Sequence, residues 1–207
     1  MEQKTAIVIG ASTGIGAATA EALAQQYKKI AITSFRHPEK LKEVQQKILA
    51  QGTDCYAETG DAGDFTFVKQ FIEHVTEHFG EKIDLLVNNA GISYVGLLTD
   101  MDETDWKRII DTNITSVFNT CRQVLPYMVH AHKGRIINIS SVWGNVGASC
   151  EVAYSACKGG INAFTKALGK ELAPSHIPVN AIACGVIDTD MNRCFDETER
   201  AELADEI

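Results

Sequence analysis

The chain has 207 residues, of which 45% are hydrophobic and 22% charged, which is enough apolar material for one globular core. Its formal net charge of −8 argues against non-specific binding to nucleic acid or to an anionic membrane surface, and no segment is long enough to span a membrane. The six cysteines are scattered, and the chain starts without the apolar stretch of a secretory signal, so we expect free thiols and a cytoplasmic protein. His74 and His78 share a predicted helical face without a third ligand near them in the sequence, so we expect no metal site.

Short apolar runs alternate along the chain with longer segments of helical periodicity. The predicted strands are Thr5–Ile9, Lys29–Ser34, Asp54–Glu58, Ile83–Val87, Arg135–Ser140 and Pro178–Ala183. The predicted helices are Gly14–Gln26, Glu39–Gln51, Phe65–Phe79, Glu103–Val129 and Ala153–Ala173. The strand segments are apolar at consecutive positions, which is typical of strands covered on both faces. Repeated β–α units predict an α/β fold with a Rossmann-type, doubly wound parallel sheet in three α/β/α layers.

Glycines follow the first predicted strand, in the segment Gly10-Ala11-Ser12-Thr13-Gly14-Ile15-Gly16. The spacing G-x-x-x-G-x-G is a variant of the dinucleotide-binding fingerprint. Glycines there permit a tight turn and let backbone N–H groups approach a pyrophosphate at the positive end of the next helix. Between a buried strand and an amphipathic helix, this turn predicts a dinucleotide site.

The end of the second predicted strand indicates which dinucleotide binds. It reads Thr33-Ser34-Phe35-Arg36-His37, without the carboxylate that binds free ribose hydroxyls. Ser34 and Arg36 suit a 2′-phosphate, so we expect NADP(H) rather than NAD; in the alternative, Arg36 is a solvated loop residue. Asp61, after the third strand, either accepts from the adenine amino group or is a turn residue.

Tyr154 and Lys158 are spaced i, i+4 and therefore project from one face of a predicted helix. An ammonium beside a phenol favours the phenolate, so we expect the tyrosine pKa to be lowered from its ordinary value of about 10. Such a pair predicts a proton donor for a carbonyl that is being reduced near neutral pH.

Four motifs together resemble the short-chain dehydrogenase/reductases, in order and over nearly the whole chain: the glycine-rich turn, Asn88-Asn89-Ala90-Gly91, Ser141 and Tyr154-x-x-x-Lys158. The resemblance implies a catalytic set of Asn113, Ser141, Tyr154 and Lys158, in which Ser141 positions the carbonyl and Asn113 holds a water linked to Lys158. The cofactor-binding residues that the motifs and the resemblance indicate are Gly10, Ser12, Thr13, Gly14, Ile15, Gly16, Ser34, Arg36, Asp61, Asn89, Ala90, Gly91, Tyr154, Lys158, Gly185, Ile187 and Thr189.

The carboxyl-terminal part departs from the family pattern. Cys184-Gly185 stands where the family usually has Pro-Gly, and the chain stops at Ile207 without a counterpart of the family's last helix and seventh strand. We therefore expect residues 1–207 to form one NADP-binding domain that is incomplete at its end. Residues 188–207 are expected to be the start of a mobile substrate-binding loop.

The overall resemblance is to bacterial 3-oxoacyl-(acyl carrier protein) reductases, which implies NADPH-dependent reduction of a small-molecule or carrier-bound ketone to a secondary alcohol. The stretch from Ser140 to Glu151 is similar instead to reductases of the 5-aminopentanone group on elongation factor P, which makes that protein an alternative substrate. Glu151 either attracts the ammonium of such an aminoketone or merely caps the following helix.

Two other functions remain open: a non-catalytic NADP-binding regulator, and a dehydrogenase that uses NAD to oxidise a sugar or steroid alcohol. In the family, helices that match Glu103–Val129 and Ala153–Ala173 pair across a two-fold axis. The resemblance therefore implies a homodimer or homotetramer, with no nucleic-acid or membrane partner.

Overall fold

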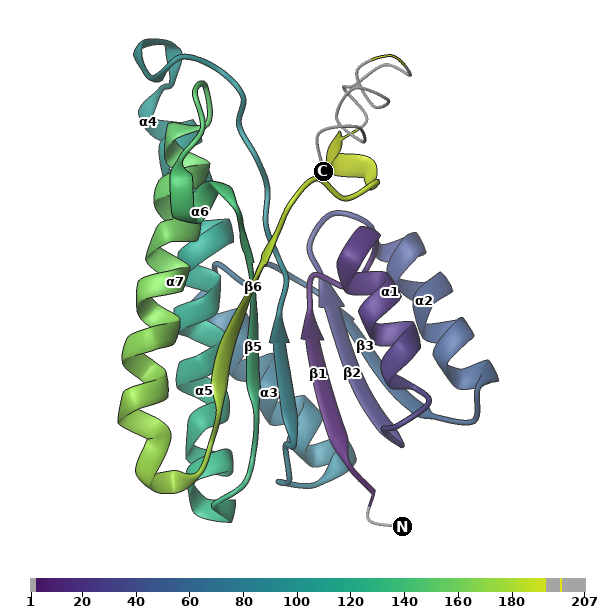
Figure 1. Ribbon diagram of the computed structural model, residues 1–207. Coiled ribbons are helices and arrows are strands. Elements are labelled where there is room, and N and C mark those ends of the chain that lie inside the picture. The colour runs from purple at the N-terminus through teal and green to yellow at the C-terminus, as the bar shows by residue number, and fades with distance from the viewer. Residues whose placement is uncertain (1–2, 193–197, 199–207) are drawn as a thin grey trace.

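Six parallel strands organise the chain in this computed structural model, which describes residues 3–192 and residue 198 (Figure 1). The strands are β1 (Thr5–Ile9), β2 (Lys29–Ser34), β3 (Asp54–Thr59), β4 (Leu85–Asn88), β5 (Ile136–Ser141) and β6 (Val179–Cys184). Their order in the sheet is β3-β2-β1-β4-β5-β6, and every neighbouring pair is parallel. The predicted doubly wound parallel sheet is confirmed. Strands β2 and β3 are added on one side of β1, and strands β4, β5 and β6 on its other side.

Helices cover both faces of the sheet. They are α1 (Gly14–Leu23), α2 (Pro38–Ala50), α3 (Phe65–Phe79), α4 (Glu103–Ile110), α5 (Ser116–Ala131), α6 (Trp143–Val146) and α7 (Val152–Leu172). Buried residues of α3, α5 and α7 pack with Ile7, Leu86 and Ile136 on one face. Buried residues of α1 and α2 pack on the other face, with Ala6 and Val8. This is the three-layer α/β/α arrangement predicted from the sequence.

The one clear difference among the predicted helices lies in Glu103–Val129. That segment forms α4 and α5 joined by a π-helical turn, η2 (Asp111–Thr115), in which one residue more than usual fits into the turn. The sequence analysis also did not predict the short helix α6. Helix α3 has the predicted bounds, and its cap is Asp64, whose carboxylate accepts from the Thr66 N–H at 2.8 Å.

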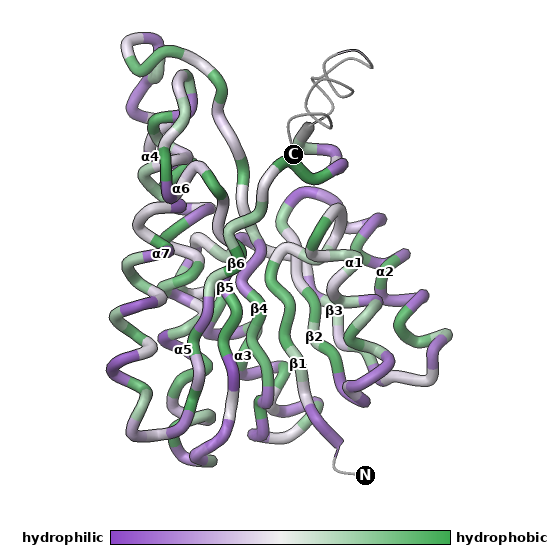
Figure 2. The backbone as a smooth tube through the Cα atoms, in the orientation of Figure 1, coloured by the Kyte–Doolittle hydropathy of each residue, from purple (hydrophilic) through white to green (hydrophobic). Residues whose placement is uncertain are grey.

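Figure 2 shows the apolar strands in the middle of the molecule, between more hydrophilic helices. Every residue of β1 is buried, as expected for a strand covered on both faces. The two edge strands are different: β3 is buried only at Cys55, and Ile182 in β6 is 51% exposed. Because all strands are parallel, their carboxyl ends lie at one edge of the sheet, where ligands bind in such folds.

The described residues reach only the beginning of the segment 188–207. Asp190–Asn192 form a short 3₁₀ turn, η4. The remainder of the predicted substrate loop, apart from residue 198, lies outside the described residues.

Candidate active site

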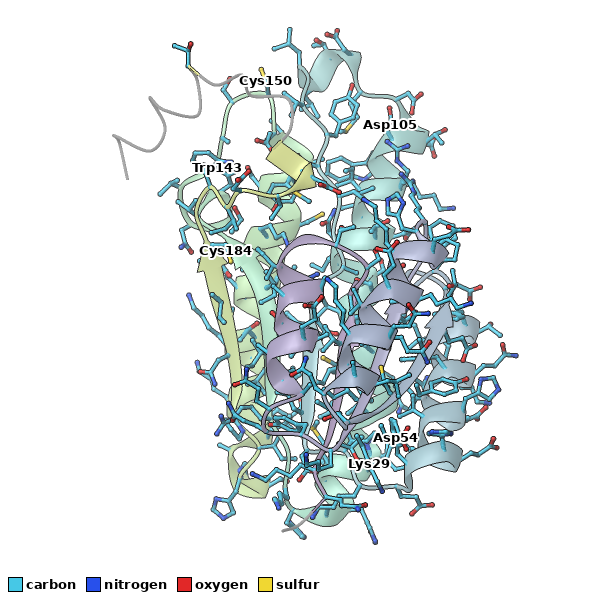
Figure 3. The ribbon with its side chains drawn as sticks, turned by 90° about the vertical axis from the view of Figure 1, so that its right-hand side faces the viewer. Lys29, Asp54, Asp105, Trp143, Cys150 and Cys184 are labelled. Atoms are coloured by element: carbon cyan, nitrogen blue, oxygen red, sulfur yellow. The ribbon has the colours of Figure 1, made fainter. Side chains whose placement is uncertain are left out.

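One cleft runs along the carboxyl edge of the sheet. Figure 3 places Cys184, the last residue of β6, and Trp143, which follows β5, toward the same end of the molecule. Lys29 and Asp54, the first residues of β2 and β3, lie at the opposite end. The loops after β1, β2, β3, β4 and β6 line the cleft, together with the end of β5 and with α7.

The glycine-rich turn forms one wall of this cleft, and at Gly10 and Gly16 a larger residue would not fit. Gly10 has a φ of +79°, and a Cβ on it would lie 2.6 Å from the Cα of Ala90. A Cβ on Gly16 would collide with the Gly10 carbonyl oxygen and the Asn89 side chain. The Asn89 amide donates to that same carbonyl at 2.7 Å, which ties the loop after β4 to the loop after β1.

The N-terminus of α1 opens into the cleft and is suited to an anion. Its N-cap residue, Thr13, makes no side-chain capping hydrogen bond, and its first turn carries no acidic residue. The free N–H groups of a helix N-terminus attract a phosphate. Thr189 reaches over this turn from the segment after β6, since a Cβ on Gly14 would lie 3.2 Å from its methyl group.

At the other end of the cleft, two buried hydroxyl groups have unmet hydrogen-bonding capacity. Thr33 is 1% exposed and Ser34 is 6% exposed, and neither hydroxyl has a hydrogen-bond partner in the described part of the chain. Buried polar groups are normally paired, so these hydroxyls fit a polar ligand such as a ribose or phosphate group. Arg36 is exposed on the same wall.

Asp61 also lines the cleft, and one of its carboxylate oxygens accepts from the Gly63 N–H at 2.8 Å. The turn role considered for this residue is therefore confirmed. The contact between Asp61 and the adenine amino group stays a prediction, for which the second carboxylate oxygen would serve.

Ser141, Tyr154 and Lys158 meet in the cleft although they come from two elements. Ser141 ends β5, whereas Tyr154 and Lys158 lie on successive turns of α7. The Lys158 ammonium is 5.5 Å from the centre of the Tyr154 ring, and the Ser141 hydroxyl, which accepts from the Trp143 N–H at 3.2 Å, acts to lower the Tyr154 pKa. A glycine at position 144 lets α6 pack against α7 here, because a Cβ would lie 2.6 Å from the Lys158 carbonyl carbon.

The pKa of Tyr154 is raised, mainly by burial, and the Glu151 charge acts in the same direction while the Ser141 hydrogen bond opposes it. The prediction of a lowered pKa is therefore wrong for this structure. The i, i+4 spacing places the ammonium 5.5 Å from the ring centre, but burial is the largest influence on the Tyr154 pKa and raises it. A raised pKa keeps the phenol protonated at neutral pH, which is the form that donates a proton.

Lys158 is 3% exposed, and burial lowers its pKa to about 8. Its ammonium donates to the Ile139 carbonyl oxygen at 2.7 Å. The folded chain thus holds an ammonium beside Tyr154, where water is largely excluded.

Asn113 lies behind the cleft rather than in it. It is 0% exposed, and its side-chain amide donates to the Ile92 and Ile109 carbonyls at 2.9 and 3.0 Å. Its Oδ1 accepts from the Ile92 N–H at 3.2 Å. The side chain therefore joins the π-helical turn to the loop after β4, and its link to Lys158 through water stays a prediction.

The structure brings the other predicted site residues together. Of the predicted catalytic and cofactor residues, all line the cleft except Gly16, which packs beneath it, and Asn113. The sequence analysis missed Thr33, Cys184 and Met191, which also line the cleft. Thr33 could have been predicted from its place next to Ser34 at the carboxyl end of β2, whereas no sequence pattern points to Met191.

Among residues 3–192 and 198, no group of three or more His, Cys, Asp or Glu side chains is arranged to hold a metal ion. His74 and His78 pair instead with Glu58 and Asp54, at 3.0 and 3.5 Å. The same part of the chain contains no helix that is both long and apolar enough to cross a membrane.

Comparisons with known proteins agree with this site. The family model of the short chain dehydrogenases matches residues 4–200. The 3-oxoacyl-(acyl-carrier-protein) reductase FabG of Staphylococcus aureus strain Mu50 is 39% identical over 204 residues, which cover 99% of this chain and 82% of the relative. A crystal structure of a short-chain alcohol dehydrogenase from Sinorhizobium meliloti 1021 matches with a TM-score of 0.93 and 34% identity, over 100% of this chain and 82% of that one. A crystal structure of a variant actinorhodin polyketide ketoreductase with NADPH matches with a TM-score of 0.89 and 30% identity, over 97% and 80%.

The chain belongs to the short-chain dehydrogenase/reductase family. It is accordingly an oxidoreductase that interconverts CH–OH and C=O groups with a nicotinamide cofactor. The glycine cradle, the open N-terminus of α1 and the unpaired hydroxyls of Thr33 and Ser34 fit such a cofactor.

Proposed function

We propose that this enzyme uses NADPH to reduce a ketone to a secondary alcohol, as 3-oxoacyl-(acyl carrier protein) reductases do. The observation that carries the proposal is one continuous cleft with Tyr154, Ser141 and Lys158 at one end and Ser34 and Arg36 at the other. The bound nicotinamide would supply the hydride. The relative from Staphylococcus aureus carries the name of such a reductase, and the polyketide ketoreductase structure contains NADPH.

In this proposal Tyr154 donates its phenolic proton to the carbonyl oxygen as that oxygen gains negative charge. The Ser141 hydroxyl hydrogen-bonds the same oxygen and holds it in place. The buried Lys158 ammonium stabilises the negative charge on the tyrosine oxygen after the proton has left. Each of these groups already faces the cleft in the folded chain.

Tyr154→Phe tests the catalytic proposal because it removes only the hydroxyl group. We expect NADPH oxidation with acetoacetyl thioesters to fall at least about a hundredfold, while NADPH binding, measured by fluorescence titration, is unchanged. A non-catalytic regulator would bind NADPH equally well in both forms and turn over no ketone in either. Wild-type turnover that survives in Tyr154→Phe would contradict the assignment of Tyr154.

Arg36 tests the choice of cofactor. A charge-assisted hydrogen bond to a 2′-phosphate is worth about 2 kcal/mol, so Arg36→Ala should raise the KM for NADPH about thirtyfold and leave the KM for NADH unchanged. Arg135→Ala, which removes an arginine at the opposite end of the sheet, is the matched control. A wild-type enzyme that prefers NADH would contradict the proposal and favour the oxidative dehydrogenase.

A second candidate substrate is an amine-bearing ketone such as the 5-aminopentanone group on elongation factor P. Glu151 supports it, because this residue occupies the N-cap position of α7 without making a capping hydrogen bond. Its carboxylate instead accepts from the Ser93 hydroxyl at 2.6 Å and adds negative charge near Tyr154. A carboxylate there attracts the ammonium of an aminoketone.

Glu151→Gln separates the two substrates. It should reduce kcat/KM for an aminoketone about tenfold or more and that for a neutral β-keto thioester much less, since only the first substrate loses an opposite charge. Ser93→Ala controls for loss of the hydrogen bond without loss of the charge. An equal loss on both substrates would remove the aminoketone candidate.

We also propose that the enzyme forms a homodimer through α4 and α5. Trp106, Phe118 and Val129 on these helices are 41%, 50% and 38% exposed, an apolar surface that a second copy would cover. Sedimentation velocity should show a dimer or tetramer that Phe118→Asp weakens and Leu49→Asp, on α2, does not. A wild-type monomer at micromolar concentration would contradict this proposal.

A further inference from the structure

A chain of buried hydrogen bonds runs from α5 over β4 and β5 to α7, along one face of the sheet. The Thr120 hydroxyl of α5 donates to Asn88 Oδ1 at 2.7 Å, and Asn88 Nδ2 donates to Asn138 Oδ1 at 2.9 Å. Asn138 Nδ2 then donates to Thr165 Oγ1 of α7 at 2.9 Å. None of these four residues, here called the polar chain, is more than 5% exposed.

The hydrogen bonds of the polar chain run in one direction only. The Thr165 hydroxyl donates to the Ile161 carbonyl at 2.7 Å, so its oxygen is left to accept from Asn138. That fixes the orientation of the Asn138 amide, which in turn fixes the Asn88 amide with its Oδ1 toward Thr120. The single hydrogen of the Thr120 hydroxyl has its shortest acceptor distance to this oxygen, at 2.7 Å, and the Ser116 and Val117 carbonyls lie at 2.9 and 3.1 Å. Every member is satisfied, and removal of any one leaves a buried polar group without its partner.

The polar chain connects the elements that carry the site. Asn88 and Asn138 are directly paired in the register of β4 and β5. Just beyond them, β4 leads into the cofactor loop and β5 ends at Ser141. In α7, Thr165 lies about two helical turns after Lys158, and both side chains are buried.

Two other hydrogen bonds join α7 to β5, both at Lys158: its ammonium donates to the Ile139 carbonyl at 2.7 Å, and its carbonyl accepts from the Ser140 hydroxyl at 3.2 Å. Beyond Lys158, α7 also packs on the sheet through apolar residues such as Ile161 and Leu168. Apolar contacts are not directional and tolerate a small shift or rotation of a helix. A hydrogen bond between an amide and a hydroxyl is directional and does not. The bond from Asn138 to Thr165 therefore adds a directional contact about two turns beyond Lys158, and a helix held at both places has one position along β5.

We propose that Asn138 and Thr165 are positioning residues, which hold α7 on β5 so that Tyr154 and Lys158 face Ser141. The inference rests on the catalytic roles proposed for those three residues. Neither Asn138 nor Thr165 lines the cleft, so they act through the position of the helix and not by touching the substrate.

Thr165→Val tests the inference, because it keeps the shape of the side chain and removes its hydroxyl. We expect kcat to fall about tenfold to a hundredfold, the loss typical of a catalytic group displaced by about 1 Å, while the KM for NADPH changes less than about twofold. The pH profile of alcohol oxidation should also shift, because Tyr154 moves relative to Ser141, whose hydroxyl lowers the Tyr154 pKa. Thr165→Ser keeps the hydroxyl and should restore both kcat and the profile.

Thr53→Val is the matched control, because it removes another buried hydroxyl, which donates to the Ala24 carbonyl at 2.9 Å far from the cleft. It should lower the melting temperature comparably and leave kcat unchanged. A Thr165→Val enzyme with normal kcat and an unchanged pH profile would overturn the inference, as would an equal loss of kcat in Thr53→Val. If Thr165→Val does not fold, Asn138→Ala applies the same test, because it removes the amide that donates to the Thr165 hydroxyl.

The result can be told apart from a failure of the catalytic proposal. Full turnover by Tyr154→Phe would show that the proposed chemistry is wrong. An inactive Tyr154→Phe together with a fully active Thr165→Val would retain the chemistry and refute only the positioning role.

Discussion

Replacing Lys158 by methionine should abolish activity and, at neutral pH, stabilise the protein. The pKa of Lys158 is lowered to about 8 from an ordinary value of 10.5. Below pH 8 the ammonium is charged in both states, so the folded state carries the full cost of burying it, about 3 kcal/mol at pH 7. Methionine fills a similar volume but leaves the Ile139 carbonyl without its donor, which costs about 1 kcal/mol. The net gain at pH 7 is therefore about 2 kcal/mol.

The pH dependence of this gain distinguishes it from a change in packing. Between pH 8 and pH 10.5 the folded lysine is neutral while the unfolded one is still largely protonated, so the cost shrinks as pH rises. Urea unfolding should show the advantage of Lys158→Met falling to about zero at pH 10. Lys166→Met, which removes an exposed ammonium from the same helix, should differ from wild type by less than about 0.5 kcal/mol at either pH. A Lys158→Met protein that is less stable than wild type at pH 7 would refute the reasoning.

Two further substitutions test the walls of the cleft. Lys40→Met breaks a 3.0 Å ion pair with Asp190, which links α2 to the segment after β6 beside the cleft, and should raise the NADPH dissociation rate about twofold to fivefold in stopped-flow measurements. Lys47→Met breaks another 3.0 Å pair on α2, outside the cleft, and an equal effect there would contradict this role. Gly10→Ala should abolish NADPH binding in calorimetry because its methyl group would meet the backbone of the loop after β4. Gly52→Ala is the control, because Gly52 has a similar positive φ but open space around it. Normal NADPH binding by both variants would show that the close approach of Gly10 to the loop after β4 is unimportant.

The sequence predicted the fold and most of the site because those features depend on local patterns. The bounds of β1, β2 and α3 follow from hydrophobic runs, caps and turn residues that lie next to one another in the chain. The glycine-rich turn is predictable for the same reason, since its spacing between a strand and a helix already implies close backbone approach. Tyr154 and Lys158 were predicted to share a face by helical periodicity alone, and they do.

The properties of these residues were less predictable, because they depend on burial and on distant partners. The pKa of Tyr154 is raised mainly by packing around it, which the helical spacing does not reveal. The sequence left open whether Glu151 caps α7 or attracts an ammonium; its carboxylate makes no capping hydrogen bond and accepts instead from Ser93, far away in the chain. The hydrogen bonds of the Asn113 side chain to the backbone of Ile92 were not predictable either, because Ile92 is distant in the chain.

The amino-acid sequence by itself determined the order of β–α units, the glycine-rich turn and the candidates for the catalytic side chains. Hydrophobic periodicity and turn chemistry act over a few residues, so they can be read without the fold. The tertiary structure alone decided which titratable groups lose water and which polar groups find partners, as in the hydrogen bond between Asn138 and Thr165. Desolvation and hydrogen bonding depend on atoms brought together from distant parts of the chain, and only the folded sheet and its helices set those distances.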